Sequence, residues 1–165
     1  MDSEFVNRVD QTRIIPNLQF SSLMVDVISR GKDFRFRASG NSMSPFIKND
    51  DVVTFCSINS KPICVGDVVA FLHPTYKNLI VHRVIAKKPE IFLIKADNAH
   101  KYDAWVKQNQ IIGIVSRVER NGTTIKFGMG HEKWIISLLS HFNILGFSIR
   151  ILRKCFPFLY RRLIT

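Results

Sequence analysis

Two residues of this chain have the types needed for nucleophilic catalysis. Ser42 lies in the glycine-containing segment 40–46, GNSMSPF, and His82 lies in the segment 81–85, VHRVI. A serine hydroxyl is a poor nucleophile at neutral pH, and neutral imidazole is well suited to take its proton and return it to a leaving amine. The pair therefore predicts a serine protease, in which Ser42 attacks and His82 moves the proton.

The surrounding motifs give these two residues a context. Serines near glycine are common in turns, and a single strand histidine is more often structural than catalytic. In chain order the motifs are SMSP at 42–45, KNDD at 48–51 followed by VVTF, GDVVAF at 66–71, VHRVI at 81–85 and KADN at 95–98. In this combination the chain resembles the signal peptidase I and LexA-like serine peptidases over roughly residues 30 to 118.

The resemblance also implies which branch of that superfamily fits best. Bacterial signal peptidases and LexA-like proteins use a lysine base where this chain has His82, so the chain is most similar to the Ser-His-Asp branch, with endoplasmic-reticulum signal peptidase and SipW. Asp97 and Asp103 both match acidic positions of that branch. We expect Asp103 to orient His82, because a position just after a strand can aim a carboxylate back at a neighbouring strand. Asp97 is the alternative, and it can also tie down its loop as an Asx turn.

The oxyanion of a tetrahedral intermediate needs donors that are fixed before the reaction. The backbone N–H of Ser42 is the natural first donor, and a second backbone N–H or the side chain of Asn41 or Ser39 is expected to supply the other. Many signal peptidases carry a serine at the position of Gly40, whereas LexA-like proteins have a glycine there, as this chain does. Gly40, Asn41 and Met43 thus form the expected oxyanion or substrate-binding group, with Met43 filling an apolar gap.

The elements that position these residues are mainly β-strands. Short segments rich in β-branched or aromatic residues alternate with Gly, Pro or Asn signals, and Phe34 and Phe36 alternate with arginines ahead of Ser42. The strand segments are 52–56, 68–72, 79–85, 91–94, 111–118 and 123–127. They predict a twisted β-barrel or sandwich. Leu18, Phe20, Leu23, Met24, Val27 and Ile28 have helical spacing, and this short helix is expected to end at 29–31.

We expect one domain core, because 165 residues with 46% hydrophobic content can bury one substantial core but hardly two. The predicted organisation is an N-terminal segment at 1–30, a peptidase catalytic domain at 31–128 and a basic, hydrophobic helical tail at 129–165. No signal peptide or N-terminal membrane anchor is expected in the first segment.

The C-terminal tail has two interpretations. Its apolar run at 134–149 is shorter than the roughly 20 residues that a spanning helix prefers, and basic residues follow it. One interpretation is attachment to an anionic membrane surface, with the cytoplasmic face of the cytoplasmic membrane favoured. The other is a helical pair that breaks near 143–146 and packs on the protein itself.

The formal charge of +11 also permits nucleic-acid binding, but no helix-turn-helix fits before Gly40, so no specific nucleic acid is expected. The odd set Cys56, Cys64 and Cys155 has no metal-ligand spacing with the histidines. We therefore expect no metal and no cofactor, and the cysteines suit a reducing compartment.

The resulting expectation is an endopeptidase that cleaves an extended leader or precursor peptide. The resemblance implies that the substrate adds as a strand beside the site, with small residues before the cut. The alternatives are a LexA-like regulator that cleaves itself and a noncatalytic membrane-binding adaptor that retains the fold.

Overall fold

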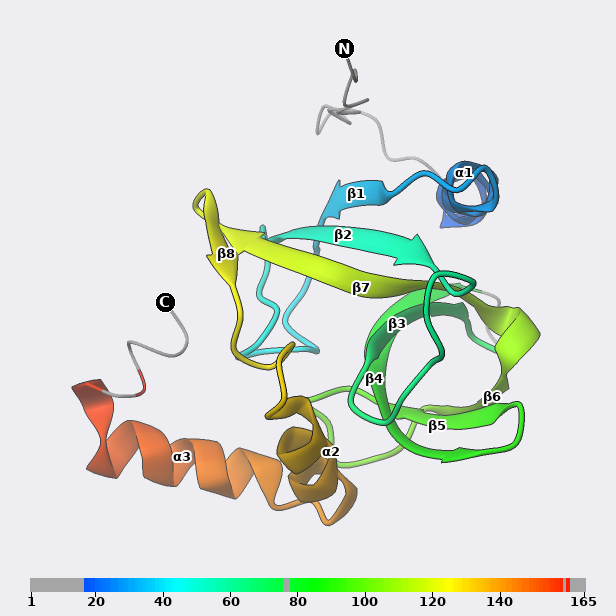
Figure 1. Ribbon diagram of the computed structural model, residues 1–165. Coiled ribbons are helices and arrows are strands. Elements are labelled where there is room, and N and C mark those ends of the chain that lie inside the picture. The colour runs from blue at the N-terminus through cyan, green and yellow to red at the C-terminus, as the bar shows by residue number, and fades with distance from the viewer. Residues whose placement is uncertain (1–16, 76–77, 159, 161–165) are drawn as a thin grey trace.

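One curled antiparallel sheet forms most of the molecule (Figure 1). The computed structural model describes residues 17–75, 78–158 and 160. The strands within this part are β1 (Phe34–Arg37), β2 (Val52–Ser57), β3 (Val68–Leu72), β4 (Leu79–Lys88), β5 (Ile91–Lys95), β6 (Ala104–Lys107), β7 (Ile111–Arg120) and β8 (Thr123–Ile125). Their order is β1-β2-β7-β3-β4-β5-β6, and β8 pairs with β7.

Irregularities in the pairing of three strands contribute to the curl of the sheet. The register shifts between Thr54 and Phe55 in β2, between Ala70 and Phe71 in β3, and within β4 opposite β5. Such bulges bend a strand and increase its right-handed twist. The expected mainly-β fold is confirmed, and the predicted barrel or sandwich takes the form of a single sheet curled into a half-barrel.

Two apolar clusters fill the two sides of this sheet. One lies under helix α1 (Asn17–Ser29), where Met24 and Ile28 meet Val53 and Phe55 of β2. The second lies inside the curl and includes Phe71, Val84, Phe92, Ile94 and Ile114. Alternation of buried and partly exposed residues in β2 aims Val53 and Phe55 at α1.

Helix α1 is the predicted N-terminal helix. It ends at Ser29, and the N–H of Gly31 donates to the carbonyl of Ile28 at 3.0 Å with a φ of +72° at Gly31. Glycine is the residue that adopts this left-handed conformation most readily after a helix. The expected stop at 29–31 is therefore confirmed, while residues 1–16 of the N-terminal segment lie outside the described residues.

The helices α2 (Lys133–His141) and α3 (Leu145–Cys155) lie at the opposite end of the molecule from α1 (Figure 1). Ile136, Ser137 and Ser140 of α2 are buried, and the Ser137 hydroxyl donates to the Val84 carbonyl at 3.2 Å. The two helices meet at a bend of 119°. No single helix among the described residues has the length and hydropathy of a membrane span, although α2 and α3 taken together have the length and composition of a bent one. One face of α2 thus packs on the sheet.

The strand β6 is the main element that the sequence pattern did not predict. It has four residues, of which Val106 alone is buried. β1 is equally short but has phenylalanines that alternate with arginines, whereas the sequence of β6, AWVK, shows no such alternation.

The core position of Val53 predicts a stability effect. Val53 is 1% exposed, so Val53→Ala removes buried methyl groups, leaves a cavity and should lower the free energy of unfolding by about 2–3 kcal/mol. The same substitution at Val25, which is 44% exposed, is the matched control and should change it little. Urea unfolding measures both, and equal effects would contradict this assignment of the core.

Candidate active site

The turn that carries Ser42 follows β1 and is tightly hydrogen-bonded. Gly40 has a φ of +91°, a conformation that L side chains rarely adopt. The N–H of Ser44 donates to the Asn41 carbonyl at 3.1 Å, and the N–H of Ile47 donates to the Met43 carbonyl at 3.0 Å. Met43 is buried in the cluster under α1, whereas Ser42 is exposed, so the turn anchors its neighbour in the core and presents the serine to solvent.

Ser42, His82 and Asp103 form a continuous hydrogen-bonded chain. The distance from His82 Nε2 to Ser42 Oγ is 3.0 Å, and that from His82 Nδ1 to Asp103 Oδ2 is 2.6 Å. Nε2 can accept the serine proton only if the neutral imidazole carries its own proton on Nδ1. That N–H then donates a hydrogen bond to the Asp103 carboxylate. This is the arrangement in which imidazole can remove a proton from a hydroxyl.

His82 lies on β4 opposite Val69 of β3, in the middle of the sheet. It is 9% exposed, and both ring nitrogens are hydrogen-bonded, to Asp103 and to Ser42, so the orientation of the ring is fixed. The placement satisfies the need for a base of fixed orientation beside an accessible nucleophile.

Asp103 lies just before β6, not just after a strand as the sequence reasoning assumed. Its N–H donates to the Ile94 carbonyl at 2.9 Å, which holds this residue beside the end of β5. The carboxylate reaches back to β4 from the loop that joins β5 to β6. Asp103 therefore does reach His82 on a neighbouring strand, as predicted, but it does so from the loop that leads into the unpredicted strand β6.

Asp97 has a different partner. Arg83 Nε donates to Asp97 Oδ1 and Arg83 Nη2 donates to Asp97 Oδ2, both at 2.8 Å, and both side chains are 0% exposed. Arg83 Nη1 donates to the carbonyls of Gly66 and Gly128, also at 2.8 Å. The structure thus places Asp97 in a buried ion pair away from His82 and places Asp103 on the imidazole.

A second arginine supports the nucleophile turn from the other side. Arg120 donates to both oxygens of Asp51, at 2.8 and 2.7 Å, and Arg120 Nη2 also donates to the Phe46 carbonyl at 3.3 Å. Burial, together with the positive charge of Arg120, lowers the pKa of Lys48, while Asp51 opposes this shift. Sequence reasoning did not identify Arg120, whose partner lies 69 residues away.

The backbone N–H groups near Ser42 are available for an oxyanion. In the part of the chain that the structure describes, the N–H groups of Asn41, Ser42 and Met43 donate no backbone hydrogen bond, whereas the N–H of Gly40 donates to Asn49 Oδ1 at 3.0 Å. The Asn41 side-chain oxygen accepts from the Asn49 N–H at 3.4 Å. The second oxyanion donor therefore stays open between a backbone N–H and the side chain of Asn41 or Ser39.

Two residues of the KADN motif position the site without being predicted to do so. The N–H of Asn98 donates to the Ser42 carbonyl at 2.8 Å, which ties the nucleophile turn to the loop after β5. Lys95 is buried, and its Nζ donates to Asn143 Oδ1 at 2.6 Å and to the carbonyl of Ser140. Desolvation lowers the pKa of Lys95, and the negative charge of Asp97 opposes this shift. A lysine at the end of an otherwise apolar strand was the available signal that its side chain is buried and has a polar partner.

Among the described residues, no group of three His, Cys, Asp or Glu side chains could hold a metal ion. Cys56, Cys64 and Cys155 have free thiols. The groups of the candidate site that can do chemistry include the Ser42 hydroxyl, the His82 imidazole and the Asp103 carboxylate.

A known protein family matches much of this chain. The model of a family described as Peptidase S24-like matches residues 4–118, which is well over half of the chain and includes Ser42, His82, Asp97 and Asp103. No curated protein matches this sequence.

The different environments of the two aspartates predict different effects on stability. Asp97→Asn leaves the buried charge of Arg83 without its carboxylate and should lower the free energy of unfolding by about 3–5 kcal/mol. Asp103→Asn is the matched control, and since the Asp103 side chain is 20% exposed and Asn can still accept from His82, its effect should be much smaller. Urea unfolding of both variants provides the test, and a larger loss for Asp103→Asn would contradict the assignment.

Proposed function

The chain belongs to the Peptidase S24-like family, and from this premise we propose that it is a serine endopeptidase with a Ser42-His82-Asp103 mechanism. The single observation that carries the proposal is the hydrogen-bonded chain from Ser42 Oγ through His82 to Asp103. Membership of the family supports a peptidase, and the contacts of the three side chains support the choice of nucleophile, base and orienting group.

In the proposed reaction, Ser42 Oγ attacks a peptide carbonyl carbon while its proton passes to His82 Nε2. Asp103 accepts the Nδ1–H hydrogen bond and stabilises the imidazolium. Backbone N–H groups at Ser42 and an adjacent residue hold the oxyanion. The C–N bond then breaks, and His82 gives the proton to the leaving amine.

The second half of the reaction releases the acyl group. Water attacks the acyl ester on Ser42, and His82 takes the water's proton as the new C–O bond forms. The ester bond then breaks, Ser42 recovers a proton from His82, and the carboxylic acid product leaves.

An extended leader or precursor peptide is the proposed substrate. The strand β1 lies at one end of the described sheet, pairs there with β2, and runs directly toward the Ser42 turn. A free strand edge offers backbone groups that can pair with an extended peptide. Signal-peptidase-like processing is thus favoured over attack on compact folded proteins.

The role of Ser42 is tested by a closely matched pair of variants. Ser42→Ala removes the attacking oxygen and should reduce kcat/KM for an extended peptide at least about a thousandfold, as should His82→Ala. Ser44→Ala makes the same change two residues away and should leave cleavage nearly unchanged. Peptide-library cleavage followed by mass spectrometry measures all three. Cleavage that survives Ser42→Ala would overturn the proposed mechanism.

The role of Asp103 is tested through kcat. Asp103→Asn keeps the size of the side chain but removes the charge that stabilises the imidazolium, so kcat should fall by about 10³–10⁴-fold with a much smaller change in KM. Steady-state kinetics on the folded variant, checked by circular dichroism, measures this effect. A large rise in KM at unchanged kcat would assign Asp103 to substrate binding.

The LexA-like alternative and the adaptor alternative predict other results. A chain that shortens during incubation, with no shortening in Ser42→Ala, would favour self-cleavage over cleavage of a separate peptide. Folded wild-type protein that cleaves neither itself nor any peptide of the library would favour a noncatalytic adaptor, since a fold does not by itself establish activity.

A further inference from the structure

The helices α2 and α3 present a large apolar surface that the fold leaves uncovered. We propose that this surface docks the protein on an anionic lipid membrane, independently of whether Ser42 is catalytic. The exposed apolar side chains, here called the α2–α3 face, are Trp134, Ile135, Leu138, Phe142, Ile144, Phe147, Ile151, Phe156 and Phe158. Exposed aromatic and aliphatic residues concentrated in this way mark an interaction surface.

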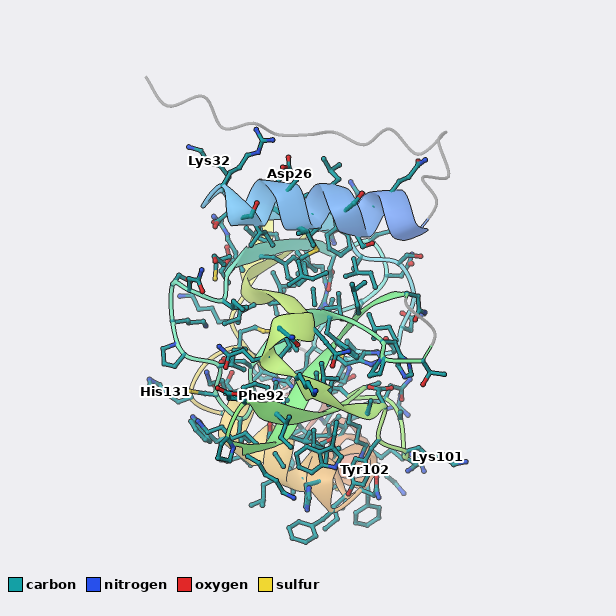
Figure 2. The ribbon with its side chains drawn as sticks, turned by 90° about the vertical axis from the view of Figure 1, so that its right-hand side faces the viewer. Asp26, Lys32, Phe92, Lys101, Tyr102 and His131 are labelled. Carbon is teal, nitrogen blue, oxygen red and sulfur yellow. The ribbon has the colours of Figure 1, made fainter. Side chains whose placement is uncertain are left out.

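The helical spacing separates this face from the packed side. Trp134, Leu138 and Phe142 recur every four residues, and 52–62% of each is exposed. Ser137 and Ser140, which are buried against the sheet, occupy the other side of α2. The exposed residues therefore are not parts of the protein core, and side-chain rings project from these helices away from the sheet at the foot of Figure 2.

The charge of the region matches an anionic membrane. The sequence has no Asp or Glu after Glu132. Arg150, Arg153 and Lys154 are exposed on α3, and within the described part of the chain none of the three forms an ion pair. Apolar side chains bordered by unpaired basic groups suit insertion at the headgroup level of an anionic leaflet.

The bend between the helices favours a surface position. No single described helix is long and apolar enough to cross a membrane, and the two helices meet at a bend of 119°, so a position along the interface suits both of them. Ile135 and Leu152 also line an apolar recess of about 240 Å³ beside Phe46, so the apolar surface continues inward between the helices.

A second copy of the chain is the competing occupant. In a two-fold dimer the same patch meets itself, so the basic residues of both α3 helices would lie together with no acidic residue of either helix to pair with them. A membrane supplies the missing anions, and for that reason we favour it.

The face has a fixed orientation relative to the candidate active site. Lys95 binds Asn143 and the carbonyl of Ser140, and the Tyr102 hydroxyl donates to the His141 carbonyl at 3.1 Å. Tyr102 precedes Asp103 directly and lies beside the C-terminal helices in Figure 2. Docking would therefore hold the Asp103 side of the site close to the lipid surface.

Vesicle cosedimentation of the full chain tests the proposal. Binding to phosphatidylcholine vesicles should be weak and should increase strongly when phosphatidylglycerol is included. Leu138→Gln with Phe147→Gln should weaken it at least about tenfold, since less apolar surface leaves water. The matched control, Val25→Gln with Trp105→Gln, changes two exposed apolar residues outside the face and should bind as the wild type does.

The charge contribution is tested in the same assay. Replacing Arg150, Arg153 and Lys154 with Gln should weaken binding to the anionic vesicles by roughly a hundredfold. Replacing Lys32, Lys87 and Lys107, which are exposed elsewhere, removes the same charge and should cost much less. Equal losses in the two triple variants, or a stable dimer in gel filtration with no vesicle binding, would overturn the proposal.

The two tryptophans of the chain report the contact directly. In a Trp105→Phe protein, the fluorescence of Trp134 should be quenched by brominated lipid. In a Trp134→Phe protein, the fluorescence of Trp105 on β6 should not be quenched by brominated lipid. Quenching of Trp105 alone would place the membrane on another surface. Because this readout needs no cleavage, its failure is distinguishable from failure of the proposed peptidase activity.

Discussion

The buried pair of Arg83 and Asp97 is the interaction on which the arrangement of the site depends. Both side chains are 0% exposed, and four N–H groups of the guanidinium are bound, two by the carboxylate and two by the carbonyls of Gly66 and Gly128. A buried charge of this kind is tolerated only when its hydrogen-bonding groups are satisfied. The pair consequently fixes four segments to one another: β4, the loop after β5, the turn before β3 and the chain before α2.

The ion pair helps to position His82 and Ser42 because residues next to Arg83 and Asp97 in the sequence belong to the site. His82 precedes Arg83 on β4, and Asn98 follows Asp97 and binds the Ser42 carbonyl. Since both carboxylate oxygens of Asp97 are bound to Arg83, Asp103 is the aspartate left for the imidazole. Burial thus separates the two aspartates into a structural group and a group that contacts the candidate base.

Much of this organisation could be predicted from local sequence, and the rest depends on distant contacts. The β-branched and aromatic composition of 52–56 and the helical spacing before Gly31 predict β2 and α1, because each signal depends on a short window. The order of motifs also brings Ser42 and His82 together as candidates. In contrast, the partner of Asp97 and the Arg120–Asp51 pair depend on side chains that are separated in the chain, and the sequence of β6 has no alternation of apolar and polar residues.

Lys95 connects the C-terminal helices to the strands beside the candidate site. It lies on β5 opposite Arg83, yet its ammonium group extends to the end of α2 and binds the carbonyl of Ser140. The carbonyls at the end of a helix carry partial negative charge and favour a cation, which offsets part of the cost of burying this lysine. Tyr102 makes a second link, from the residue next to Asp103 to the carbonyl of His141. The end of α2 is therefore bonded to β5 just before Asp97 and to the loop that holds Asp103, so direct contacts connect the C-terminal helices to the candidate site.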